Sequence, residues 1–117
     1  MMSSTDLTRW GLQVLPDVLV VRIFGDLKHD LGDLFEKVVE RALRLNHRKV
    51  ILDFSEVDSI DSLGLVLCGY GLYHFRQLGI PVALVRPPAA LLPVLQGHGM
   101  DELPEVFIHE QDARMLN

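Results

Sequence analysis

Apolar and polar residues follow one another along this chain in blocks of two kinds, short runs typical of strands and longer periodic segments typical of helices. The pattern predicts strands at Arg9–Leu15, Val18–Phe24, Lys49–Asp53, Ile80–Val85 and Pro104–Ile108. It predicts helices at Leu31–Leu45, from Ser62 to about Leu78, after Pro87-Pro88, and from His109 to Leu116. The expected fold is therefore α/β, with a mixed and mostly parallel sheet of about five strands and about four helices.

The two long helices differ in where their apolar residues lie. The segment from Leu31 to Leu45 has apolar residues at the i, i+3, i+4, i+7 spacing and charged residues opposite, as expected for a helix on a core. The segment from Ser62 to Leu78 is apolar at nearly every angular position. In a small domain one side of that helix must stay outside the core, which favours a contact with a foreign partner or a homodimer. Gly69 and Gly71 within it indicate close packing, either against the sheet or against another chain.

Length and composition limit the class of protein. A chain of 117 residues with 49% hydrophobic and 23% charged residues is one folded domain, expected at residues 8–117 after a flexible stretch at residues 1–7. A single cysteine, Cys68, excludes an internal disulfide and is expected to be a buried thiol. No apolar run is long enough to span a membrane and no signal peptide is evident, so we expect a cytoplasmic protein without membrane insertion.

Charge and motif content argue against several functions. A net charge of −5 disfavours direct nucleic-acid binding, and the densest basic stretch is expected to be a solvated helix end; it comprises Arg41, Arg44, His47, Arg48 and Lys49. The five histidines form no i, i+4 pair, which argues against a metal site. Neither glycine-rich phosphate-binding motif is present, so no cofactor is expected.

One serine stands at a position suited to capping a helix or to carrying a phosphate. Ser62 lies where a helix should begin, so its hydroxyl could cap backbone N–H groups, and a phosphate there would be stabilised by those groups and the helix dipole. Four acids are predicted in loops at the carboxyl ends of strands, the edge at which open α/β sheets bind ligands and partners; they are Asp26, Asp53, Asp58 and Asp61. A serine-hydrolase site is disfavoured because Ile60 replaces the first glycine of G-x-S-x-G.

The order of motifs resembles the STAS domain of anti-sigma factor antagonists. The main signature is a strand ending in Asp followed by Asp-Ser-x-Gly-Leu at a helix start, here Val50-Ile51-Leu52-Asp53 and Ile60-Asp61-Ser62-Leu63-Gly64-Leu65. The resemblance continues through Phe24-Gly25-Asp26-Leu27, Leu78-Gly79-Ile80-Pro81-Val82 and Gly99-Met100-Asp101-Glu102-Leu103. It thus covers nearly the whole chain.

The resemblance implies a regulatory binding protein of the sporulation or stress-response type and not an enzyme. In such antagonists the serine matching Ser62 is phosphorylated by a serine-kinase anti-sigma factor, which releases the antagonist, and a serine phosphatase reverses the modification. The implied partner-binding residues are Asp26, Lys28, Asp58, Asp61, Ser62, Leu63, Gly64, Leu65 and Val66. A phosphate among these acidic and apolar residues would penalise docking while leaving the fold intact.

Two departures from the family pattern keep an alternative open. Lys28 follows Gly25-Asp26-Leu27 where many members have Asp, and Leu63 stands where sporulation-type members often have a second serine. Lys28 could pair with a phosphate on Ser62 or mark a different partner surface. The alternative is a non-phosphorylated STAS subunit of a signalling scaffold or of a lipid-transport ATPase. Ser55 and Ser59 are neighbouring hydroxyls, and only the resemblance prefers Ser62 over them.

Overall fold

A computed structural model of the chain describes residues 9–27, 31–46, 49–97, 99–100 and 103–115. Within these residues the predicted order of elements, ββαβαβαβα, is confirmed. The strands are β1 (Arg9–Val14), β2 (Val18–Leu27), β3 (Lys49–Ile60), β4 (Val82–Val85) and β5 (Glu105–Phe107). The helices are α1 (Leu31–Leu45), α2 (Ser62–Gln77), α3 (Leu91–Gly97) and α4 (Glu110–Met115). The segment 1–7 expected to be flexible lies outside the described residues.

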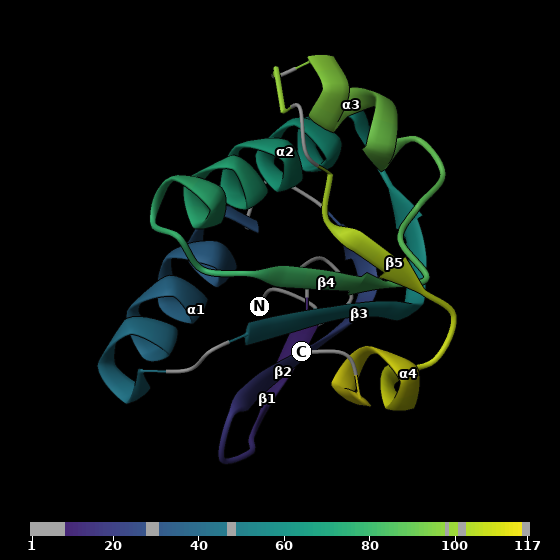
Figure 1. Ribbon diagram of the computed structural model, residues 1–117. Coiled ribbons are helices and arrows are strands. Elements are labelled where there is room, and N and C mark those ends of the chain that lie inside the picture. The colour runs from purple at the N-terminus through teal and green to yellow at the C-terminus, as the bar shows by residue number, and fades with distance from the viewer. Residues whose placement is uncertain (1–8, 28–30, 47–48, 98, 101–102, 116–117) are drawn as a thin grey trace, which may run out of the picture.

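The described strands form one mixed sheet in the order β1-β2-β3-β4-β5. β1 pairs antiparallel with β2 as an edge hairpin, and all other neighbouring strands are parallel. Helices α1, α2 and α3 cover one face and α4 lies on the other (Figure 1). Because side chains alternate along a strand, the three central strands supply both faces: Leu19 and Val21 of β2 join the larger core, and Val20 joins the smaller one under α4.

The two central strands run further than their apolar runs predict. β2 continues to Leu27 and β3 to Ile60, and these extensions pair with each other, with register shifts between Arg22 and Phe24 and between Gly25 and Asp26. β4 pairs with β3 only as far as Asp53, so the extensions project beyond the rest of the sheet. The prediction that Asp26, Asp53 and Asp58 lie in loops is therefore wrong, because all three lie within strands.

Other boundaries shift for local reasons. β4 begins at Val82 because Pro81 only contributes its carbonyl, which accepts a hydrogen bond from the Val50 amide at 2.9 Å. α3 begins at Leu91, three residues after the prolines predicted to open it. Lys49 is not part of a solvated helix end, because its side chain is buried and its Nζ donates to the Ala113 carbonyl at 2.6 Å.

Gly71 and Cys68 of α2 serve the packing of the domain. A Cβ at Gly71 would overlap the ring of Phe35, so the close approach there is to helix α1, and neither the sheet nor another chain makes it. Cys68 is fully buried, as predicted, and its burial raises the pKa of the thiol to about 12.

We expect the thiol of Cys68 to be inert in the native protein, because both burial and the raised pKa suppress the thiolate that reacts with electrophiles. A disulfide exchange reagent should modify less than one equivalent on the time scale of minutes, and one full equivalent once denaturant is added. Rapid modification without denaturant would contradict the burial of this side chain.

Candidate functional site

Helix α2 begins at the far end of the β3 extension, and its first residues have distinct roles. Asp61 is the N-cap: its backbone is extended and its Oδ1 accepts a hydrogen bond from the Gly64 amide at 2.7 Å. The expectation that the Ser62 hydroxyl caps the helix is wrong, because Ser62 is the first helical residue and the aspartate side chain already supplies the cap. Ser62 is thereby left exposed at the positive end of the helix dipole.

Three serine hydroxyls lie along this edge, and the structure distinguishes them. The Ser55 hydroxyl is hydrogen-bonded to the Asp53 carboxylate, and the Ser59 hydroxyl donates to Asp26 Oδ1 at 2.7 Å across the paired extensions. Within the part of the chain that the structure describes, no hydrogen bond engages the Ser62 hydroxyl. Ser62 is therefore the hydroxyl that can be modified without breaking a contact of the fold.

The start of α2 is held against β2 by close backbone packing. The Asp61 amide donates to the Leu27 carbonyl at 3.4 Å, and a Cβ on Gly64 would lie 2.6 Å from that same oxygen. Gly64, predicted as a partner-binding residue, is buried and lies at the point of contact between α2 and β2. Its small size fixes where Ser62 stands relative to the sheet.

The outer side of α2 carries a row of exposed apolar side chains, which we call the α2 stripe. Its members recur at helical spacing and expose between a third and two thirds of their surface: Leu63 (50%), Val66 (39%), Tyr70 (63%) and Tyr73 (36%). The predicted site residue Leu65 is half-buried and packs against the core instead. The apolar surface that the sequence predicts for a partner is therefore present, and it starts one residue from Ser62.

Two of the predicted acids, Asp26 and Asp61, lie near the start of the stripe, and Asp58 lies in the β3 extension. Asp58 and Asp61 are exposed, and Asp26 is half-buried beside Ser59. Lys28, the predicted cation of the site, lies outside the described residues. The described part of the predicted site thus combines carboxylates, one accessible hydroxyl and an apolar helix face.

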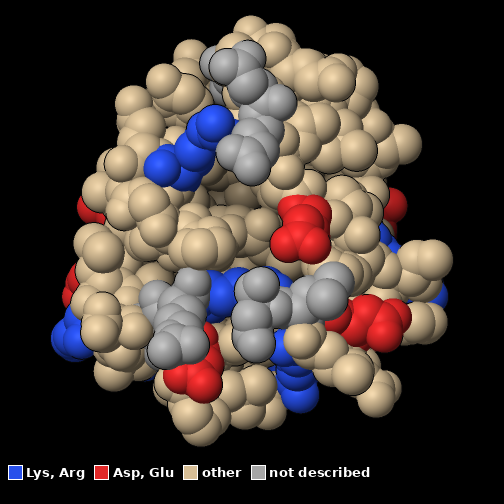
Figure 2. Space-filling model, in the orientation of Figure 1, with Lys and Arg blue, Asp and Glu red and all other residues tan. Residues whose placement is uncertain are grey.

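Two cavities are lined in part by α2. A groove of about 270 Å³ runs between α1 and α2 and borders the stripe; it is lined in part by Phe35, Val39 and Leu67. A hollow of about 530 Å³ lies at the start of β4 and β5 and is lined by Arg76 of α2, Glu105 of β5 and apolar residues. Figure 2 shows this face, with a basic and an acidic side chain on opposite sides of a depression.

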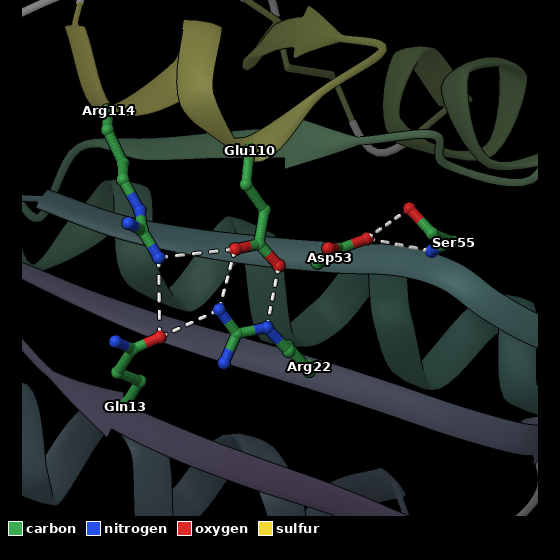
Figure 3. Close-up of polar contacts among 6 residues, drawn as sticks. All are labelled: Gln13, Arg22, Asp53, Ser55, Glu110 and Arg114. Carbon is green, nitrogen blue, oxygen red and sulfur yellow. Dashed lines mark hydrogen bonds and ion pairs between the residues drawn. The ribbon is translucent and has the colours of Figure 1, made fainter.

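A polar cluster under α4 is absent from the predicted site. Arg22, Glu110, Arg114 and Gln13 form a network there, and Asp53 lies beside them with its carboxylate bonded to Ser55 (Figure 3). The signal that could have revealed it is Arg22, the only charged residue in the apolar run Val18–Phe24. Such a charge in an interior strand needs a buried partner, which the sequence does not identify.

The described residues bring together no group of three or more His, Cys, Asp or Glu side chains suited to a metal ion. None of their helices has the length and apolar content needed to cross a bilayer.

Comparison with known proteins agrees with the observed fold. The family model described as the STAS domain matches residues 9–113. No curated protein matches the sequence. Among solved structures, the anti-sigma factor antagonist SpoIIAA is similar in its unphosphorylated form, with a TM-score of 0.68, 20% identity and coverage of 92% of this chain and 96% of that one.

Two more structures give similar values. The phosphorylated form of SpoIIAA from Bacillus has a TM-score of 0.66 at 19% identity, covering 93% of this chain and 100% of its own. An anti-sigma factor antagonist from Mycobacterium paratuberculosis has a TM-score of 0.68 at 20% identity and covers 97% of both chains. At these identities the likeness shows a shared fold.

Proposed function

Because the chain belongs to the STAS-domain family, we propose that it is an anti-sigma factor antagonist whose binding to a serine-kinase anti-sigma factor is controlled by reversible phosphorylation of Ser62. A serine phosphatase would restore the binding form, and the exchange would take place in the cytoplasm. The proposal is supported by the fold that this chain shares with antagonists, one of which was solved with and without phosphate. The observation on which the proposal mainly rests is the accessible hydroxyl of Ser62 at the start of α2.

The chemistry of the helix start makes this serine a suitable acceptor. Its hydroxyl is exposed and needs no bond to be broken, whereas the hydroxyls of Ser55 and Ser59 are engaged. Asp61 occupies the Gly64 amide, which leaves the amides of Ser62 and Leu63 at the helix end for a phosphate. The modified domain would therefore keep its fold.

The effect of the phosphate would be exerted on the partner. A phosphoserine adds about −1.5 to −2 charges at neutral pH. Asp61 precedes it as the cap of α2, and the α2 stripe begins after it at Leu63. A partner that covers the start of the stripe at Leu63 would also cover the neighbouring Ser62, so the phosphate would be desolvated beside the Asp61 carboxylate on docking. Repulsion and desolvation together would dissociate the complex.

The test compares Ser62→Asp, Ser62→Ala and the unmodified chain for binding to each serine-kinase anti-sigma factor of the source organism, by calorimetry. We expect Ser62→Asp to weaken binding to its kinase at least tenfold, about 1.4 kcal/mol, because it places a charge in the interface. Ser62→Ala should bind like the unmodified chain, since it removes only the hydroxyl. It should also fail to accept phosphate when the kinase and ATP are added.

The opposite outcome is equally informative. If Ser62→Asp binds as tightly as the unmodified chain, phosphorylation does not control the complex, and the stripe serves a constitutive assembly. That result would favour the non-phosphorylated subunit of a signalling scaffold or lipid-transport ATPase, for which the exposed apolar row on α2 is as suitable.

A further inference from the structure

Helix α4 covers the second face of the sheet with very little structure of its own. It has six residues, Glu110–Met115, and a helix this short is unstable in isolation. Ala113 is its one buried residue and completes a small apolar core; the strand residues of that core are Val20, Ile51, Ala83 and Val85. The helix must therefore be held in place mainly by what fixes its two ends.

Its first residue is held by a pair of charge-assisted hydrogen bonds. The Glu110 carboxylate accepts from Arg22 Nε at 2.8 Å and from Arg22 Nη2 at 2.7 Å, a bidentate pair between α4 and β2. Gln13 Oε1 of β1 accepts from the same Arg22 guanidinium at 2.7 Å and from Arg114 at 3.3 Å. Figure 3 shows these side chains converging from three elements on one point beneath the helix.

The last turn of α4 is held by a lysine. Lys49 Nζ, from the start of β3, donates to the Ala113 carbonyl at 2.6 Å and lies 5.8 Å from the centre of the Phe107 ring. Carbonyls in the last turn of a helix lack intrahelical partners, and a cation there also complements the helix dipole. Both ends of α4 are thus attached to the sheet through charged groups.

A second carboxylate, that of Asp53, lies beside the Arg22–Glu110 pair that attaches the first residue of α4. Asp53 of β3 is buried next to Glu110, and burial raises the pKa of Asp53, which Glu110 raises further. Arg22 in turn lowers the pKa of Glu110. The charged groups that face the two carboxyls are Arg22 from β2 and Arg114 from α4, while β1 contributes the neutral Gln13 and β4 and β5 contribute the apolar Val85 and Phe107. His109, Asp112 and Glu105 are exposed.

We propose that α4 is a releasable cover of this sheet face and that the Asp53–Glu110 carboxyl pair loosens its attachment as the pH rises. A protonated Asp53 can donate a hydrogen bond to the Glu110 carboxylate, whereas an ionised Asp53 places a like charge beside it. Release of the helix bares the apolar strip of Val20, Ile51, Ala83 and Val85 without touching the larger core under α1 and α2. This device is independent of phosphorylation at Ser62.

Whether the attachment of α4 strengthens or weakens with pH follows from the direction of each pKa change. Asp53 holds its proton more tightly in the folded state, so its contribution is complete below its ordinary value of 3.8 and is lost as the pH rises through its raised pKa. Glu110 has a lowered pKa, so its contribution is complete above its ordinary value of 4.5 and is lost as the pH falls through the lowered pKa. The attachment is therefore strongest between the lowered pKa of Glu110 and the raised pKa of Asp53.

The test is amide hydrogen exchange of the full chain at pH 4, 5, 6, 7 and 8, with each rate corrected for the intrinsic pH dependence of exchange. We expect protection of the α4 amides to fall at least about threefold over this range while the amides of α1 keep theirs. In Asp53→Asn the fall should disappear, because the amide cannot ionise. The matched control Asp58→Asn, an exposed carboxylate of the same strand, should keep the fall.

Glu110→Gln supplies a second, independent readout. It removes the ionic bond to Arg22 while keeping the shape of the side chain, so α4 should lose protection at every pH and α1 should not. The proposal is overturned if Asp53→Asn shows the same fall as the unmodified chain. It is also overturned if α4 in Glu110→Gln exchanges only together with α1, because the helix then opens only when the whole domain unfolds.

Discussion

A Phe75→Ala variant is expected to lose about 3–5 kcal/mol of stability, a large part of the 5–15 kcal/mol typical of a domain. Phe75 is the largest fully buried side chain among the described residues and lies on the inner side of α2, with its ring 6.1 Å from that of Phe35 at an interplanar angle of 68°. Alanine removes the ring and leaves a cavity between α2 and α1, which the close approach of Gly71 to Phe35 prevents from collapsing. Urea denaturation followed by circular dichroism measures the loss.

Tyr70→Ala is the matched control, since it removes an aromatic ring from the opposite side of the same helix. Tyr70 is 63% exposed, so we expect its removal to change stability by less than about 1 kcal/mol. Under the proposed function it should instead weaken binding of the kinase, because Tyr70 belongs to the α2 stripe. Comparable losses of stability in the two variants would mean that the inner and outer sides of α2 are assigned incorrectly.

The sequence predicts the elements well where periodicity and terminating residues agree. The helix at Leu31–Leu45 is found within its predicted limits because its apolar row stops where Asn46 takes a left-handed backbone. The order and direction of the strands follow from the alternation of strand and helix. The extensions of β2 and β3 escape prediction because they are polar: Ser59 and Asp26 adopt strand geometry by pairing with each other across two distant segments.

The candidate site is predicted in part for similar reasons. Asp61, Ser62 and Leu63 are adjacent in the chain, so their place at a helix start is local information. The distinction between the hydroxyls of Ser59 and Ser62 is not local information, because it depends on a hydrogen bond that Asp26 accepts from Ser59 across two strands. The same holds for Glu110 and Arg22, which are 88 residues apart and meet only because α4 folds back over β2.

A Gly64→Ala variant is expected to displace the start of α2 and with it Ser62. An added Cβ would lie 2.6 Å from the Leu27 carbonyl oxygen and 3.2 Å from Asp61 Oδ1. The first neighbour is strand backbone, which cannot rotate away, so the helix must move. That movement would strain the Asp61 cap on the Gly64 amide and the bond from the Asp61 amide to Leu27. We expect a net loss of about 3 kcal/mol, in spite of about 1 kcal/mol gained from alanine's higher helix propensity.

Gly32→Ala is the control that separates the effect of the backbone contact at position 64 from the effect of alanine's helix propensity. Gly32 lies in the first turn of α1, and a Cβ there would meet nothing within 4 Å, so alanine should stabilise the domain by about 0.5–1 kcal/mol. Thermal unfolding of both variants gives the comparison, and amide exchange at Ser62 and Leu63 in Gly64→Ala reports on the helix start. If Gly64→Ala is as stable as Gly32→Ala, the backbone contact does not fix α2. The position of the modifiable serine would then depend on the Asp61 cap alone.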